Sequence, residues 1–148
     1  MNMSKGSEIK RVMNAVAAGT SDQNSSSVDM QNFESVTFIA SLGTLSASQV
    51  TTMKAQQSSD DGGSDAFADL AATQTDAMAD DDDDQCIVLE IVKPRERYVR
   101  VVLERATGNA VIDGILAIKT GPRKKPTTHD AATVQTSKTV VSPAEGTA

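Results

Sequence analysis

The densest group of potential metal ligands in this 148-residue sequence is a run of five aspartates, Asp80–Asp84. A calcium loop needs oxygen ligands spaced so that the backbone wraps around the ion, usually with a glycine and a distal glutamate. Adjacent aspartates project in alternating directions and lack that spacing, and two carboxylates about 4 Å apart in water repel by only ~1 kcal/mol. The stretch "DDGGSD" (60–65) is typical of a turn. We interpret both stretches as solvated surface loops, with cation binding as the alternative.

The single histidine and the single cysteine are the remaining candidates for catalysis. His129 lies in "PTTHDAAT", and a Ser–His–Asp site would need it held beside a nucleophile, which nothing in this stretch indicates. Cys86 precedes "IVLEIV" and is predicted to be a buried, small apolar residue rather than a reactive thiol. One cysteine cannot form a disulfide within the chain, as is typical of a reducing cytosol. The sequence also lacks phosphate-binding, dinucleotide-binding and zinc motifs, so we predict no enzymatic activity, no cofactor and no metal.

Basic residues gather late in the sequence and are predicted to contact a partner. From Lys93 to Lys125 there are nine basic residues against three acidic ones, whereas from Asp22 to Glu90 there are fourteen acidic residues against one lysine. This contrast favours association with copies of the chain or with a lattice of mixed charge. Nucleic acid is disfavoured as the partner, because the acidic half repels phosphates and Tyr98 is the sole tyrosine for stacking on bases. The predicted contact residues are Arg95, Arg97, Arg100, Arg123, Lys124 and Lys125.

The elements that must position these side chains are β-strands. Val36, Phe38 and Ala40 alternate with the residues between them, which is the period-2 pattern of a strand with one buried side. The stretch "QCIVLEIVK" (85–93) is nearly continuous in apolar β-formers and predicts an inner strand. About six to eight short strands are separated by turns rich in Gly, Asn, Asp and Ser. We therefore predict an all-β antiparallel sandwich, of the jelly-roll or immunoglobulin-like kind, over residues 28–121.

The last predicted strand carries a glycine in its interior. In "VIDGILAIK" (111–119), Ile112, Leu116 and Ile118 are predicted to share a face, and Gly114 between them indicates a bulge or the close approach of another backbone. Hydrophobic residues make up 39 % of the chain and aromatic residues 3 %. We therefore expect a modest core built from Val, Ile, Leu, Ala and Met.

Residues 1–27 are predicted to form a separate N-terminal segment. The spacing of its apolar residues predicts a short helix over 4–18, which would need a surface to lie on because a helix of this length is marginal in water. The segment lacks the apolar run of a signal peptide, and no stretch of the sequence approaches the ~20 apolar residues that span a bilayer, so no membrane is predicted. The apolar residues in question are Ile9, Val12, Met13 and Val16.

Residues 122–148 are predicted to form an extended C-terminal arm, because apolar β-formers become too sparse there for independent folding. Prolines and basic residues at its start direct the arm off the domain. The stretch "TVQTSKTVV" (133–141) suits addition as a strand to a neighbouring sheet, where backbone pairing gives affinity with little demand on side chains. Its predicted contact residues are Val134, Val140 and Val141.

Four stretches resemble the small structural proteins encoded among the head genes of tailed bacteriophages: "SVDMQNFESVTFIASLGTL", "KAQQSSDDGGSDAFADLAAT", "RYVRVVLERATGNAVIDGILAIKTGPRKKP" and "SPAEGTA". The resemblance extends from about Val28 to Ala148, its most specific parts are "RYVRV" and "GPRKKP", and residues 1–16 carry little of it. It implies a virion protein that is made in the host bacterial cytoplasm and has no enzymatic residues.

Within that family, the resemblance implies a capsid decoration (cement) protein on the outside of the shell. Its expected partners are the major capsid protein and copies of itself, as a dimer or trimer. A head–tail neck or tail component is the first alternative, and a nucleic-acid-facing assembly factor is the second.

Overall fold

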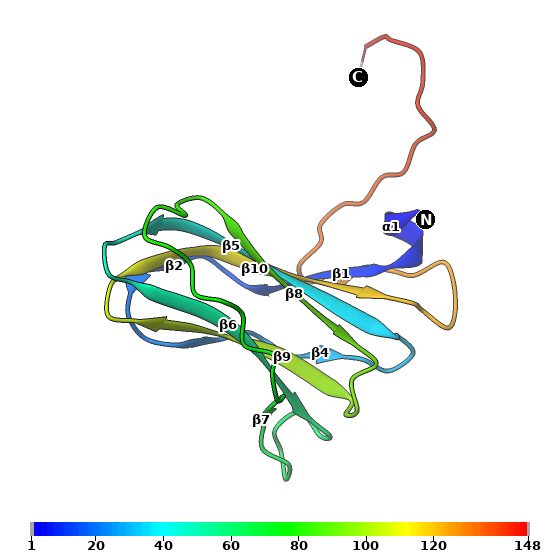
Figure 1. Ribbon diagram of the computed structural model, residues 1–148. Coiled ribbons are helices and arrows are strands. Elements are labelled where there is room, and N and C mark those ends of the chain that lie inside the picture. Colours follow the sequence, from blue (N-terminus) through cyan, green and yellow to red (C-terminus); the bar gives the residue numbers. More distant parts are fainter. Residues whose placement is uncertain (1, 148) are drawn as a thin grey trace.

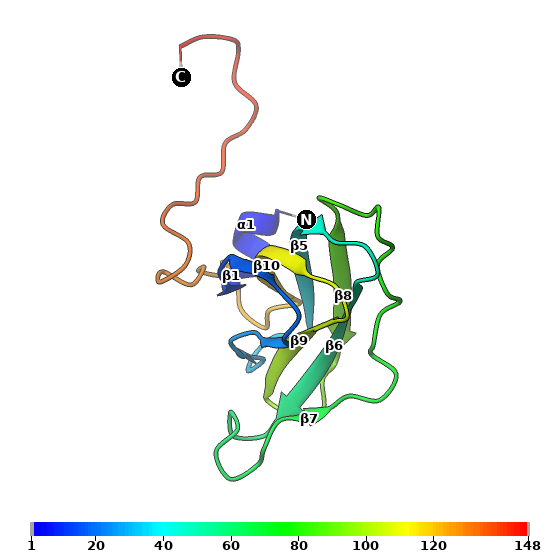
Figure 2. The same ribbon diagram turned by 90° about the vertical axis from the view of Figure 1, so that its left-hand side faces the viewer.

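The computed structural model describes residues 2–147, which form two five-stranded antiparallel sheets packed face to face and one short helix (Figures 1 and 2). The predicted all-β antiparallel sandwich is confirmed. No helix within these residues is long and apolar enough to cross a membrane. The elements are α1 (Met3–Gly6), β1 (Glu8–Met13), β2 (Val16–Gly19), β3 (Gln23–Asn24), β4 (Val28–Asp29), β5 (Ser35–Leu45), β6 (Val50–Ser58), β7 (Ala68–Asp69), β8 (Cys86–Val92), β9 (Tyr98–Ala106) and β10 (Ala110–Thr120).

The strands divide between two layers, which we call sheet A and sheet B. Sheet A has the order β1-β10-β5-β8, with β2 also paired to β10. Sheet B has the order β3-β9-β6-β7, with β4 also paired to β9. The β5–β6 and β9–β10 connections both cross between the layers, and they meet where the Ser46 N–H donates to the Asn109 carbonyl at 2.9 Å. A Cβ on Gly108 would lie 2.8 Å from the Gln49 nitrogen, so this junction requires glycine.

The core lies between the sheets and is filled by alternate residues of the long strands, as the period-2 pattern predicts. Side chains from both layers interdigitate in a single cluster, with no tryptophan and one buried phenylalanine. The largest fully buried apolar side chains are Phe38, Leu42, Met53, Leu103, Ile112, Ile115, Val28, Val36, Val99 and Val101.

The bulge predicted at Gly114 is confirmed. Its φ is +149°, and the register of β10 against β5 shifts between Ile112 and Gly114. Because an extra residue reverses the alternation, Ile112 and Ile115 are buried while Leu116 turns to the outer face. The prediction that Ile112, Leu116 and Ile118 share a face is wrong, since it carried the period-2 pattern through the bulge.

Residues 8–13 and 16–19 form strands β1 and β2 rather than a helix, so the helix predicted over 4–18 is wrong beyond Gly6. Both β1 and β2 pair with β10, and this ready-made ladder of backbone partners outweighs a short helix that is marginal in water. β3 then pairs with β9 in the other layer. Strands β1, β2 and β3 are thus part of the two sheets, although they precede Val28, the predicted start of the sandwich.

Strand β8 lies at an edge of sheet A and pairs with β5 alone, so its prediction as an inner strand is wrong. Ile87 and Ile91 face the core, whereas Val88 and Val92 are 59 % and 63 % exposed. The apolar run is continuous because both faces of the strand carry β-branched residues, not because both are covered. Cys86 at its start is exposed, which corrects the expectation of a buried thiol.

The first part of the predicted arm runs along the outer edge of β1. The Thr127 N–H donates to the Lys5 carbonyl at 3.1 Å, and the Asp130 N–H donates to the Ile9 carbonyl at 3.3 Å. The Ile9 N–H in turn donates to Nδ1 of His129 at 3.1 Å, so the single histidine braces an edge strand. Beyond residue 134 the chain is extended and exposed, and the Thr139 hydroxyl still contacts the Ser4 hydroxyl of α1 before the chain leaves the body (Figures 1 and 2).

Candidate functional site

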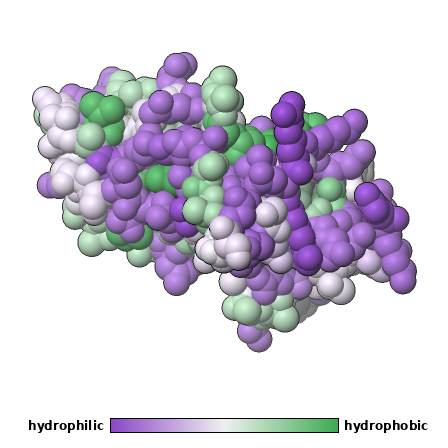
Figure 3. Space-filling model, turned by 90° about the horizontal axis from the view of Figure 1, so that it is seen from below, coloured by the Kyte–Doolittle hydropathy of each residue, from purple (hydrophilic) through white to green (hydrophobic). Residues whose placement is uncertain are grey.

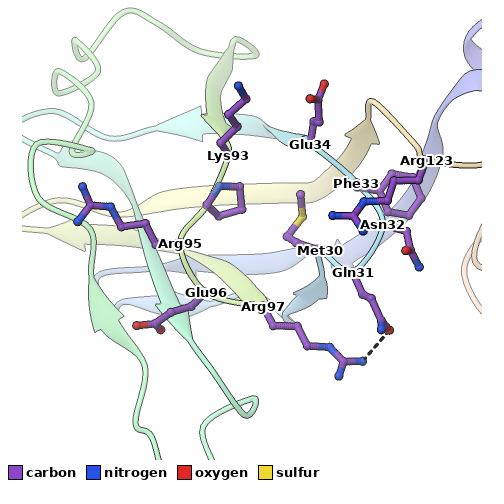
Figure 4. Close-up of a pocket in the computed structure, with 11 residues that line it drawn as sticks. Met30, Gln31, Asn32, Phe33, Glu34, Lys93, Arg95, Glu96, Arg97 and Arg123 are labelled. Atoms are coloured by element: carbon purple, nitrogen blue, oxygen red, sulfur yellow. Dashed lines mark hydrogen bonds between the residues drawn. The ribbon is translucent and has the colours of Figure 1, made fainter.

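A surface hollow of about 470 Å³, here called the basic hollow, lies where the β4–β5 turn meets the β8–β9 loop and the chain after β10 (Figure 4). Four basic and two acidic side chains line it. Three residues predicted as partner contacts, Arg95, Arg97 and Arg123, come together here. The complete lining is Met30, Gln31, Asn32, Phe33, Glu34, Lys93, Pro94, Arg95, Glu96, Arg97 and Arg123.

Backbone hydrogen bonds hold the three segments of the basic hollow together. Each bond joins two segments that are distant in sequence, so the position of the basic side chains follows from the fold rather than from their spacing in the chain. The donor is an N–H group and the acceptor a carbonyl in every case. The bonds run from Lys93 to Glu34 (2.8 Å), from Met30 to Arg97 (2.8 Å) and from Arg123 to Asn32 (2.9 Å).

Arg97 is held by a carboxylate of its own chain. Its Nε and Nη2 donate to the two carboxylate oxygens of Asp29 at 2.9 and 2.6 Å, and Nη2 also reaches Oε1 of Gln31 at 3.1 Å (Figure 4). The hydrogen bond from Arg97 lowers the pKa of Asp29, and the same contact raises the pKa of Arg97. This two-point pairing fixes one wall of the basic hollow.

Phe33, in the lining of the basic hollow, is held by a lysine that sequence reasoning did not single out. Lys119 is buried, and its Nζ lies 3.0 Å from Oε1 of Glu8 and 4.4 Å from the centre of the Phe33 ring. A cation over an aromatic face is attracted by the ring quadrupole. Its place on the core-facing side of β10, in phase with Ile115 and Ala117, was the available sequence signal, but it was concealed because the predicted alternation was carried unchanged through the bulge.

Lys93, Arg95 and Arg123 supply positive charge in the lining of the basic hollow. Within residues 2–147 none of these three side chains belongs to an ion pair. The arrangement offers several cationic donors around an open concavity with no nucleophile beside them. It suits a carboxylate-bearing loop of a protein partner, which such donors recognise through charge-assisted hydrogen bonds.

The other predicted contact residues lie elsewhere. Arg100 is on β9, where its Nε donates to Oε1 of Gln56 at 2.8 Å and its guanidinium lies 4.2 Å from the centre of the Phe67 ring. It therefore packs on the outer face of sheet B and is not part of the basic hollow. The remaining residues are the exposed pair Lys124 and Lys125 in the loop after β10, the half-buried Val134, and the exposed Val140 and Val141 on the arm.

The aspartate run is largely exposed to solvent, as interpreted from the sequence, and three of its carboxylates also brace turns. Oδ2 of Asp80 accepts the Ser48 N–H at 2.7 Å, and Oδ1 of Asp83 accepts the Leu45 N–H at 2.6 Å. Oδ2 of Asp82 accepts the N–H of Ala79 at 2.8 Å in the same way. Within the part of the chain that the structure describes, no group of three or more His, Cys, Asp or Glu residues is arranged to hold a metal ion.

A buried arginine was also missed by the sequence analysis. Arg105 donates from Nη1 to the carbonyls of Ala110 at 2.7 Å and Ala17 at 3.1 Å, and from Nε to that of Ser21 at 2.9 Å. Burial lowers its pKa. Because its partners are backbone carbonyls, Arg105 closes the β2–β3 corner over the core, and we assign it a structural part.

Comparison with known proteins adds nothing to these observations. No protein-family model matches the chain, and a search of curated proteins finds no match in sequence. The functional conclusion therefore depends on the geometry of the chain and on the resemblance described above.

Proposed function

We propose that the chain is a capsid decoration protein, which binds the outer shell of a tailed bacteriophage and stabilises it through its β-sandwich and C-terminal arm. The observation that carries the proposal is the exposure of the arm. Residues 135–147 are all exposed, and Val140 and Val141 show 62 % and 93 % of their surface to solvent. Paired valines on an extended chain gain free energy when a partner covers them.

The body supports this proposal as a rigid spacer. Two sheets share one core, and side chains such as Arg105 and Asp83 brace the loops with hydrogen bonds. The basic hollow adds a second contact, suited to an acidic loop of the capsid protein. Each contact can be weak, since repetition over a closed shell raises the effective concentration of the next one.

Removing Gln135–Ala148 tests the proposal, because this cut leaves the segment bound to β1 in place. Occupancy of the truncated protein on purified heads should fall at least tenfold, and heads carrying it should break at lower temperature. The variant Arg95→Glu with Arg123→Glu, which reverses two charges of the basic hollow, should reduce occupancy independently of the arm. Full occupancy by the truncated protein would remove the arm from the mechanism.

A further inference from the structure

Strand β8 has one side of its backbone without a partner. The Lys93 N–H donates to Glu34 and the Leu42 N–H donates to Gln85, so the odd-numbered residues of this stretch form the hydrogen-bonded pairs with β5. Backbone groups alternate in direction along an antiparallel strand. The N–H and C=O groups of the even-numbered residues therefore point away from the sheet, and nothing in residues 2–147 pairs with them. These residues are Cys86, Val88, Glu90 and Val92.

The other long edges of the two sheets are covered by the chain itself. Residues 127–134 cover β1, as described above. Along β6, beyond the short β7, the N–H groups of Leu70, Thr75 and Met78 donate to backbone carbonyls of the strand. An uncovered apolar edge strand is a template for pairing with another chain. The β8 edge is thus a seven-residue acceptor for an added strand.

We propose that residues 136–142 of one copy add to the β8 edge of a second copy as an antiparallel strand. The inference deepens the proposed function, on which it rests, by naming the partner of the arm. One register matches both apolar contacts and charge. It places Val140 opposite Val88 and Lys138 opposite Glu90. Facing pairs of this kind stabilise the pairing of two strands.

The outer face of sheet A favours the same register. Val88 faces Ile39, and Ile39 faces Leu116, so an apolar row crosses three strands, and Ile39 and Leu116 line a shallow hollow of about 300 Å³. Val140 would extend this row by one strand. The opposite face of the molecule, seen from below in Figure 3, lies over sheet B and is mainly hydrophilic. The outer face of sheet A, on which the Val140 side chain would lie, thus differs from the outer face of sheet B in carrying this apolar row.

The arm cannot reach the β8 edge of its own copy in this register. β1 and β8 lie at opposite edges of sheet A, with β10 and β5 between them. At a spacing of ~4.8 Å, a strand added outside β8 lies about 19 Å from β1. The arm leaves β1 at Val134, and the two residues to Thr136 span at most about 7 Å. Occupation of the edge in this register therefore requires a second copy.

The native cysteine provides a direct test. In the proposed register Ser142 lies opposite Cys86, and paired residues of this type have Cα atoms about 5.5 Å apart, which a disulfide can bridge. The full-length variant Ser142→Cys is oxidised gently at high protein concentration and run on a non-reducing gel. A ladder of covalent oligomers is expected, with a disulfide between residues 86 and 142 identified by peptide mapping. Glu145→Cys, three residues further along the arm, is the matched control. Its yield of covalent oligomers should be at least fivefold lower than that of Ser142→Cys.

Three results would overturn the inference. They are an absent ladder with Ser142→Cys, an equal ladder with Glu145→Cys, and a disulfide that maps within a single chain. A charge exchange checks the register separately: Glu90→Lys or Lys138→Glu in the Ser142→Cys background should lower the yield of cross-linked oligomer, and the two together should restore it. Failure of the double exchange to restore the yield would count against the register.

The two proposals fail in different ways. If the protein gives the ladder but does not bind phage heads, the addition of the arm to β8 is supported and the proposed capsid function is wrong. If the protein binds heads through its arm but residues 86 and 142 do not cross-link, the proposed function is supported and the addition of the arm to β8 is wrong.

Discussion

Nζ of Lys119 donates a hydrogen bond to the carbonyl oxygen of Asp29 at 2.9 Å, and this bond joins β10 of sheet A to β4 of sheet B. The same ammonium group pairs with Glu8 and lies over Phe33. One buried cation therefore connects the two layers beside the basic hollow.

Replacing Lys119 by Met should lower the free energy of unfolding by about 2 kcal/mol, because the part-buried Asp29 carbonyl and the half-buried Glu8 carboxylate lose their partner. Urea unfolding followed by circular dichroism measures the change. Lys124→Met, in the exposed loop after β10, is the matched control and should stay within about 0.5 kcal/mol of the natural chain. Equal midpoints for the two variants would show that Lys119 does not link the sheets.

The ion pair between Asp29 and Arg97 should make stability depend on pH in the acid range. The pKa of Asp29 is lowered in the folded state, so its charge stabilises the fold above the unfolded pKa of about 3.9, and that contribution disappears as the pH falls through the folded pKa. Both side chains are more than one third exposed, so solvent screening keeps the contribution below about 1 kcal/mol.

The variant Asp29→Asn tests this dependence, since asparagine resembles the protonated acid. At pH 7 the variant should be slightly less stable than the natural chain, and the two unfolding curves should converge as the pH falls below the lowered pKa of Asp29. A constant difference from pH 7 to pH 2 would mean that the carboxylate charge is not the source.

Two truncations should separate the part of the C-terminal segment that covers β1 from the exposed part, whose described side-chain contact with the body joins Thr139 to Ser4. A chain ending at Val134 should unfold within about 0.5 kcal/mol of the full chain, because residues 135–147 are exposed. A chain ending at Pro126 loses the hydrogen bonds to Lys5, Ile9 and Arg11, and should lose about 2 kcal/mol at roughly 0.5–1.5 kcal/mol per bond. Faster amide exchange in β1 of the shorter chain would identify the uncovered edge. Equal stability of the two truncated chains would contradict the bracing of β1.

Periodicity along the chain predicted the strands and the sandwich, because burial on one side of a sheet leaves a period of two. It did not predict position within a sheet. The run containing Val88 has the composition of an inner strand, yet it lies at an edge, since composition does not report which neighbours pair through the backbone. The segment containing Val12 fitted a helical period because a bulge between Arg11 and Met13 breaks the strand alternation there.

The basic hollow could be predicted only in part. The cluster "RERYVR" and the basic exit near Arg123 were recognised as contacts, but their convergence on one concavity depends on hydrogen bonds between loops that are distant in sequence. Lys119 and Arg105 went unnoticed because buried cations look like surface cations in a sequence. Most of their partners are carbonyl groups and an aromatic ring, which leave no charge pattern, and the one carboxylate, that of Glu8, lies at the other end of the sequence from Lys119.

Strands β1 and β8 lie at opposite edges of sheet A, so the edge from which the arm leaves and the edge that would accept an arm are on opposite sides of each copy. In a row of copies joined through the proposed contact, one end carries a vacant β8 and the other a loose arm, so the two ends grow at different rates. A ring removes both ends at once, and the angle between neighbouring copies decides how many of them close it.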